Sequence, residues 1–131
     1  MGTNESSGAV MPARVRGRAD LALRVLLAAV FAAAGLMKLA AIEFEVRGFA
    51  HFGYAPWFMY AIGVLELGAG LALLFRRSAA PAALLLGVIM VGAAFSHLRA
   101  GDGVLLALPA LVLLALLGMA AAARRGDLVA R

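Results

Sequence analysis

The strongest constraint on this chain is a long apolar run, MYAIGVLELGAGLALLF, that carries a single acid near its middle. The run extends from Met59 to Phe75, and the acid is Glu66. A charge at the centre of a membrane helix costs about 3 kcal/mol on insertion scales, so such a residue normally faces the protein interior and has a partner. Gly63 and Gly70 share a helical stripe with Glu66, and glycines let a neighbouring helix approach closely. We therefore expect Glu66 on a packed helix face.

Composition indicates an integral membrane protein. Of the 131 residues, 65% are hydrophobic, which is more apolar surface than a small soluble domain can bury. The chain has no cysteine, which excludes disulfides, thiolate metal sites and CxxC redox relays, and no other motif indicates a metal site. The net charge of +5 comes largely from arginines at the ends of apolar runs, a pattern of membrane topology signals. We expect no nucleic-acid partner.

Hydropathy predicts an all-α fold whose membrane domain, residues 20–123, has four spans, at about 21–42, 57–75, 80–98 and 104–123. We expect a disordered basic tail at 1–19, with Asp20 as the cap of the first span, and a second basic tail at 124–131. Pro81 falls just inside the third span, where a missing amide is tolerated. A cleaved signal peptide is the alternative for the first span. This span is longer than the apolar part of a typical signal peptide and contains Lys38, so a retained helix is favoured.

The distribution of basic residues predicts the orientation of these spans. Most arginines fall on one side, including Arg76 and Arg77 at the expected end of the second span, and only Lys38, Arg47 and Arg99 fall on the other. Both termini should therefore be cytoplasmic. Short connections favour a transmembrane four-helix up-down-up-down bundle in the cell membrane. Between the first two spans, the Phe-rich part of 43–57 is expected to lie along the membrane surface as an amphipathic segment.

Lys38, Glu66 and His97 are the candidate catalytic residues, because they are the ionisable groups within or at the ends of the apolar runs. At the rise of an α-helix, Glu66 lies about 13 Å below the outer surface and Lys38 about one turn below it, so the lysine stem can reach toward the acid. All three residues fall in the outer half, and the inner half is expected to hold no such group.

Two interpretations of these residues stay open. In one, Lys38 and Glu66 form a structural ion pair that fixes helix register. In the other, the pair and His97 line an outward-opening pocket, where Lys38 or His97 donates a hydrogen bond and Glu66 acts as a base. Weaker candidates for substrate contact are Tyr54, Trp57, Tyr60 and Arg99. Haem ligation by His51 and His97 is disfavoured, because the two histidines follow no spacing motif.

Three segments resemble the DoxX-like family of small four-helix membrane proteins. RVLLAAVFAAAGLMKL resembles that family's first helix, GYAPWFMYAIGVLELGAGLALLF its second, with a Gly…Glu…Gly pattern, and FSHLRAGD the end of its third. The resemblance covers about Arg24 to Leu117 and carries over Lys38, Glu66 and, less directly, His97. It implies an accessory or partner-docking subunit of a quinone-linked membrane redox system, with a membrane or periplasm-side redox protein as the partner. No motif indicates a cofactor, and the cofactor stays open, with a quinone suggested by the resemblance alone.

Three functions follow from these patterns. The first is the accessory redox subunit, which the lack of soluble domains and nucleotide motifs favours. The second is a small membrane enzyme or carrier that binds an amphipathic molecule in the Lys38/Glu66/His97 pocket, such as a quinone or an epoxide. The third is a purely structural bundle. The oligomeric state stays open.

Overall fold

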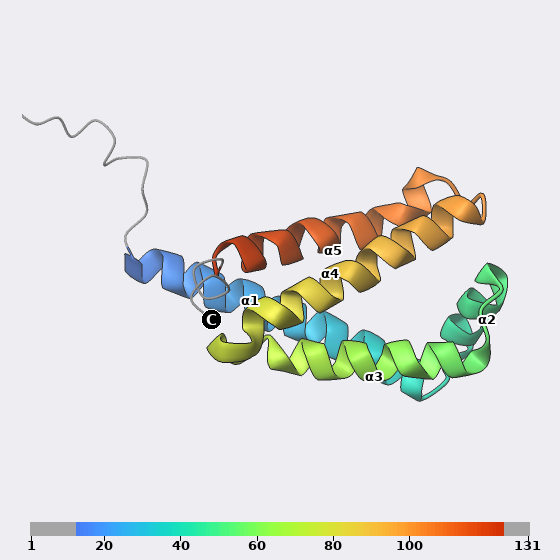
Figure 1. The fold of residues 1–131 in the computed structure, drawn as a ribbon, viewed down its shortest axis with the longest axis horizontal. Coiled ribbons are helices and arrows are strands. Elements are labelled where there is room, and N and C mark those ends of the chain that lie inside the picture. Colours follow the sequence, from blue (N-terminus) through green and yellow to red (C-terminus); the bar gives the residue numbers. More distant parts are fainter. Residues whose placement is uncertain (1–12, 125–131) are drawn as a thin grey trace, which may run out of the picture.

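The computed structural model describes residues 13–124, which form five α-helices and no strand. The helices are α1 (Ala13–Leu39), α2 (Glu43–Phe52), α3 (Pro56–Ala72), α4 (Arg76–Arg99) and α5 (Val104–Ala122). The predicted all-α class is confirmed. Figure 1 shows α1, α3, α4 and α5 lying lengthwise, with the short α2 across one end. We call that end the α2 end, and we call the opposite end, where α1 begins and α5 stops, the terminal end.

Two helix boundaries differ from the prediction. α1 begins at Ala13, so Asp20 lies inside the helix and does not cap it. Alanine and arginine are good helix formers, and Asp20 also pairs within this helix, so the first turns are stabilised locally. Arg76 and Arg77 are the first residues of α4, not the last of the preceding helix. The rest of the two predicted tails, 1–12 and 125–131, lies outside the described residues.

The prediction that Pro81 lies just inside the start of a helix is wrong. Only the first turn of a helix has backbone amides without intrahelical partners, and Pro81 lies beyond the first turn of α4. α5, by contrast, follows the predicted fourth span to within one residue at its end. The glycine before it, Gly103, has a φ of 86°, a left-handed conformation that favours glycine and marks the helix start clearly.

Three helices, α1, α4 and α5, are long and apolar enough to cross a membrane. α2 and α3 pass the same test only together, as one span bent by 118° at the residues between them. The described chain therefore has three candidate spans, or four with the bent pair, and is a multi-pass membrane protein surrounded by lipid.

The long helices pack as two pairs, α1 with α3 and α4 with α5, and contact between the pairs is sparser. Glycines allow α1 and α3 to pack closely. A Cβ atom at Gly35 of α1 would lie 2.6 Å from the carbonyl oxygen of Gly63, and one at Gly70 would lie 3.1 Å from the Cβ atom of Phe31. The expected close approach along the Glu66 face is confirmed, with α1 as the neighbour.

The core lies in the middle of the bundle and toward the terminal end. Its largest fully buried side chains are Leu27 and Phe31 of α1, Leu73 just after α3, Leu86 of α4 and Leu117 of α5. Figure 1 shows that the two pairs meet at the terminal end and spread apart toward α2. This divergence leaves space between the pairs at the α2 end.

Candidate functional site

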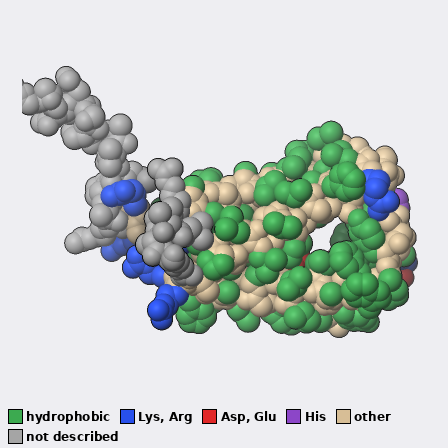
Figure 2. Space-filling model, viewed as in Figure 1, with side chains coloured by type: hydrophobic (Ala, Val, Ile, Leu, Met, Phe, Trp, Pro, Cys, Tyr) green, Lys and Arg blue, Asp and Glu red, His purple; other side chains and the backbone are tan. Residues whose placement is uncertain are grey.

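A cavity of about 470 Å³ occupies the space between the helix pairs at the α2 end. α3 and α4 supply most of its wall, and α2 with the connection that follows it covers the end of the bundle. Leu65 of α3 and Val88 of α4 line the cavity and are 41% and 69% exposed, so its mouth lies between these two helices. Figure 2 shows the molecule hollowed there. The cavity opens sideways, whereas the sequence predicted an outward opening.

Three charged side chains meet in this cavity, and we call them the charged triad. Lys38 Nζ lies 2.8 Å from Glu66 Oε1 and 3.4 Å from Glu45 Oε2. The side chains of Lys38, Glu45 and Glu66 are only 11%, 14% and 3% exposed. The predicted meeting of Lys38 with Glu66 is confirmed, whereas Glu45 was not predicted.

The close packing of α1 on α3 brings Lys38 to Glu66. A Cβ atom at Gly63 would lie 2.9 Å from the Cβ atom of Lys38, so only glycine lets the lysine stem run along α3 at this point. Glu66 lies three residues further along the same face. The Gly63 position therefore permits the ion pair.

The short turn between α1 and α2 brings in Glu45. Ala41 has a φ of 52°, a left-handed conformation that is uncommon for a residue with a side chain and that turns the chain sharply. Within α2, Glu45 and Phe49 are four residues apart and both line the cavity. Glu43 and Arg47 pair with each other on the exposed side at 2.5 Å. In the sequence, Glu45 is four residues before an aromatic ring and Glu43 is four residues before an arginine. This spacing was the signal that could have separated the buried acid, Glu45, from the exposed one, Glu43.

Aromatic rings form the rest of the wall near the triad. The four that line the cavity are Phe49, Phe52, Tyr54 and Phe58. Their centroids lie close to one another, with 5.2 Å between Tyr54 and Phe58 and 6.1 Å between Phe49 and Tyr54. The Tyr54 hydroxyl lies 2.5 Å from Ser96 Oγ, a contact that links the connection after α2 to α4.

His97 lies outside the cavity wall. Its Nδ1 atom is 2.9 Å from Asp102 Oδ2, and Nε2 of His51 is 2.7 Å from the other oxygen of the same carboxylate. These two hydrogen bonds lower the pKa of Asp102 below its usual value. His97 also packs edge-on against Phe52, with 4.9 Å between centroids. The three groups fasten α2 to the turn between α4 and α5.

The remaining predicted contacts lie beside the cavity, not in its wall. Arg99 donates a hydrogen bond to the carbonyl oxygen of Phe52 at 2.8 Å and lies 5.5 Å from the Tyr54 ring centroid. Trp57 and Tyr60 are exposed on α3, at 69% and 42%. Of the predicted site residues, the structure therefore brings together Lys38, Glu66 and Tyr54. Within residues 13–124, no group of three or more His, Asp or Glu could hold a metal ion.

A second buried cluster, at the terminal end, was not predicted. Asp20 Oδ2 lies 3.0 Å from Nε of Arg24 and also pairs with Arg124. Arg24 donates a second hydrogen bond, of 2.9 Å, to the carbonyl oxygen of Leu73 at the end of α3. The expectation that this half of the bundle holds no ionisable group is wrong. Arg24 and Arg124, interpreted from the sequence as topology signals, are both buried.

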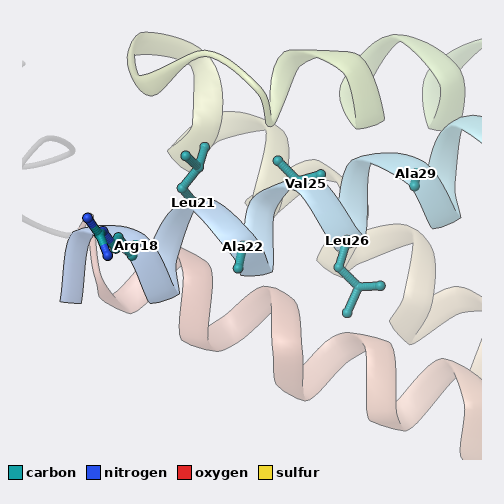
Figure 3. A pocket seen from close by; sticks show the side chains of 6 residues that line it. All are labelled: Arg18, Leu21, Ala22, Val25, Leu26 and Ala29. Carbon is teal, nitrogen blue, oxygen red and sulfur yellow. The ribbon is translucent and has the colours of Figure 1, made fainter. Parts of the chain in front are cut away.

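A shallow depression of about 610 Å³ follows one face of α1 near the same end. Figure 3 shows the side chains that line it, which all come from this helix: Arg18, Leu21, Ala22, Val25, Leu26 and Ala29. The stripe is apolar apart from Arg18 and is mostly exposed, as a lipid-facing helix surface is expected to be.

Comparison with known proteins identifies the family. The profile of the DoxX-like family matches residues 22–120, which include the Lys38–Glu66 pair, the whole of α3 and α4 and most of α1 and α5. The uncharacterized protein YdgD of Bacillus subtilis (strain 168) is 32% identical over 100 residues, covering 72% of this chain and 88% of that protein. No solved structure matches. The chain therefore belongs to the DoxX-like family.

Proposed function

We propose that this protein binds an amphipathic small molecule in the cavity beside the charged triad. It would do so in the cell membrane, crossing it four times with both termini in the cytoplasm. Counting α2 and α3 as one bent span supports four crossings. Figure 2 shows Lys and Arg side chains gathered at the terminal end, with a smaller group at the other, which supports a cytoplasmic terminal end.

The observation that carries this proposal is the cavity itself. A bundle that needed only a register lock between α1 and α3 would be complete with Lys38 and Glu66 sealed in contact. Here the pair instead faces a space of about 470 Å³, within the range of small-molecule sites. The wall is apolar and aromatic with a few convergent polar groups, as in most ligand pockets. The mouth between α3 and α4 would let the apolar part of a ligand enter from the bilayer.

The redox role implied by the resemblance stays a prediction. A quinone is amphipathic, so an accessory subunit that holds a quinone would use the same cavity, with the Lys38 ammonium donating to a quinone carbonyl. Catalysis by Glu66 as a base, with Lys38 as the donor, also stays a prediction. His97 would contribute indirectly, by fastening α2 over the ligand.

A dye-binding measurement tests the proposal. Gly92 lines the cavity, and a Cβ atom there would meet nothing within 4 Å, so Gly92→Leu fills space without a collision. Gly68→Leu on α3 is the matched control, because a side chain there also meets nothing within 4 Å but does not line the cavity. In a neutral detergent, the uncharged dye Nile red should bind saturably to the parent protein and to the Gly68→Leu variant.

The Gly92→Leu variant should lose that saturable binding. Equal binding by all three proteins would place the dye elsewhere and remove the support for the cavity as a ligand site. The topology is tested separately, with reporter fusions after Arg131 and in the 73–75 connection. Both reporters should be active in the cytoplasm, and an external reporter at either position would refute the proposed orientation.

A further inference from the structure

We propose that the ligand of this cavity is a lipophilic organic cation, whose positive centre sits between the triad carboxylates and the aromatic rings. This inference rests on the proposed binding function and goes beyond it by naming the charge of the ligand. Three features of the α2 end carry it: an excess of negative charge, a ring-lined wall and a mouth open toward lipid.

The charged triad is not electrically balanced. Glu45 and Glu66 both contact Lys38, and among residues 13–124 this lysine is their only ion-pair partner. Two carboxylates therefore share one ammonium, in side chains that are 14% exposed or less. An uncompensated charge away from water is costly, so the site favours a further positive charge.

The oxygen nearest to Lys38 retains the capacity to accept a hydrogen bond. Lys38 Nζ lies 2.8 Å from Glu66 Oε1, and a carboxylate oxygen can accept more than one hydrogen bond. Glu66 lines the cavity, so a ligand there could reach its carboxylate. A protonated amine would supply both the charge and a further donor.

The ring-lined wall favours a cation over a neutral or anionic ligand. Aromatic faces attract positive charge within about 6 Å, and Lys38 Nζ already lies 6.0 Å from the Phe49 ring centroid. Phe52, Tyr54 and Phe58 present further rings to the same space. An anion would gain the single ammonium but would face two carboxylates and the negative faces of these rings. The apolar remainder of a cationic ligand would extend past Leu65 and Val88 toward lipid.

Two probes of matched size and shape and of opposite charge test the inference. Tetraphenylphosphonium and tetraphenylborate should be compared as competitors of Nile red, in the same neutral detergent. The phosphonium should displace the dye at concentrations at least tenfold lower than the borate. This preference should vanish in the Gly92→Leu variant, because the cavity is then filled.

Single substitutions identify the groups responsible. Glu45→Gln should weaken phosphonium binding about tenfold, the loss that corresponds to one modest charge interaction. Glu43→Gln, two residues away on the exposed side of α2, should leave binding unchanged. Phe49→Leu should weaken the phosphonium and not Nile red, since it keeps the apolar volume and removes the ring face.

The outcomes separate the two proposals. Saturable Nile red binding with equal displacement by both ions, or stronger displacement by the borate, would overturn the cation inference and leave the binding function standing. A Glu45→Gln variant that folds and binds the phosphonium as tightly as the Glu43→Gln variant would also overturn it. Loss of saturable dye binding in the parent protein would remove the binding function itself.

Discussion

At both ends of the bundle, a basic side chain of α1 crosses to α3. At the α2 end Lys38 reaches the side chain of Glu66, and at the terminal end Arg24 reaches the backbone carbonyl of Leu73. In each place a third segment adds a further charged side chain: α2 adds Glu45, and the residues just after α5 add Arg124. The two clusters thus share a plan but differ in the sign of their charge.

The two clusters also differ in their surroundings. At the terminal end two arginines share Asp20, and the extra positive charge lies at the C-terminus of α3, where the helix dipole and a free carbonyl favour a cation. These contacts are all made within the protein, although Asp20 Oδ1 and Arg124 Nε are buried and have no hydrogen-bond partner among the described residues. At the α2 end two acids share Lys38, the helix pairs diverge, and the extra charge faces a cavity. Similar buried charges therefore link helices at one end and face a cavity at the other.

The largest effect should come from removing the central cation of the α2 end. Lys38→Met leaves two buried carboxylates without a partner, so we expect a loss of about 3–5 kcal/mol in unfolding free energy. Glu66→Gln should cost less, because Glu45 continues to compensate the lysine. Unfolding in detergent by a denaturant titration measures both. If Glu66→Gln proves as costly as Lys38→Met, Glu45 does not belong to the triad in solution.

The double variant sharpens this result. Lys38→Met combined with Glu66→Gln should recover part of the loss, since fewer unpaired charges remain buried. Strictly additive losses in this double-mutant cycle would show that the two residues do not interact.

The next largest effect should come from the terminal end. Arg24→Met removes a charged donor from the Leu73 carbonyl and from Asp20, which should cost about 3 kcal/mol. Arg76→Gln, at an exposed position of the same end, is the control and should be close to neutral. Because none of the residues of this cluster lines the cavity, Arg24→Met should leave saturable Nile red binding unchanged under conditions where the variant is folded. Loss of dye binding in the folded variant would contradict the separation of the two ends.

Much of this architecture follows from sequence pattern alone. A lone acid in an apolar run demands a partner, and helix rise placed Lys38 near enough to Glu66 to supply it. The apolar run after Gly103 fixed α5 to within one residue at its end. The glycines around Glu66 indicated close packing, although Gly68 faces open space and only Gly63 and Gly70 meet α1.

The rest depended on how elements pack in three dimensions. Glu45 joins the triad because the left-handed turn at Ala41 sets the direction of α2, and no sequence rule predicts that conformation for an alanine. Arg24 and Arg124 match the positive-inside rule, so their pattern did not reveal that they are buried. The sideways mouth of the cavity results from the divergence of the helix pairs, which periodicity within single helices does not report.

A moderate effect should distinguish the close contact of α1 with α3 from the looser surfaces. Gly35→Ala places a methyl group 2.6 Å from backbone atoms of α3, so the helices must separate, at a cost of about 2 kcal/mol. Gly68→Ala meets nothing within 4 Å and should be neutral or slightly stabilising, because alanine is the better helix former. Unfolding free energies in detergent check both. A neutral Gly35→Ala would mean that the close approach beneath Lys38 is not maintained in solution.

The smallest effect concerns the attachment of α2 at the outer edge of the cavity. Hydrogen bonds from His51 and His97 lower the pKa of Asp102 in the folded protein below the usual 3.8. A carboxyl with a depressed pKa contributes stability that is fully present above its unfolded value and is lost as the pH falls through its folded value. Acidification below about 3.8 should therefore loosen α2, and Asp102→Asn should remove this part of the pH dependence. Trp57, the one tryptophan of the chain, lies at the start of α3 with its ring 5.8 Å from Phe58 and can report the change by fluorescence. If the parent protein and Asp102→Asn lose the Trp57 signal along the same acid curve, Asp102 does not hold α2 in place. The terminal end offers the contrast, because its arginine clamp on the Leu73 carbonyl needs no titrating group on α3.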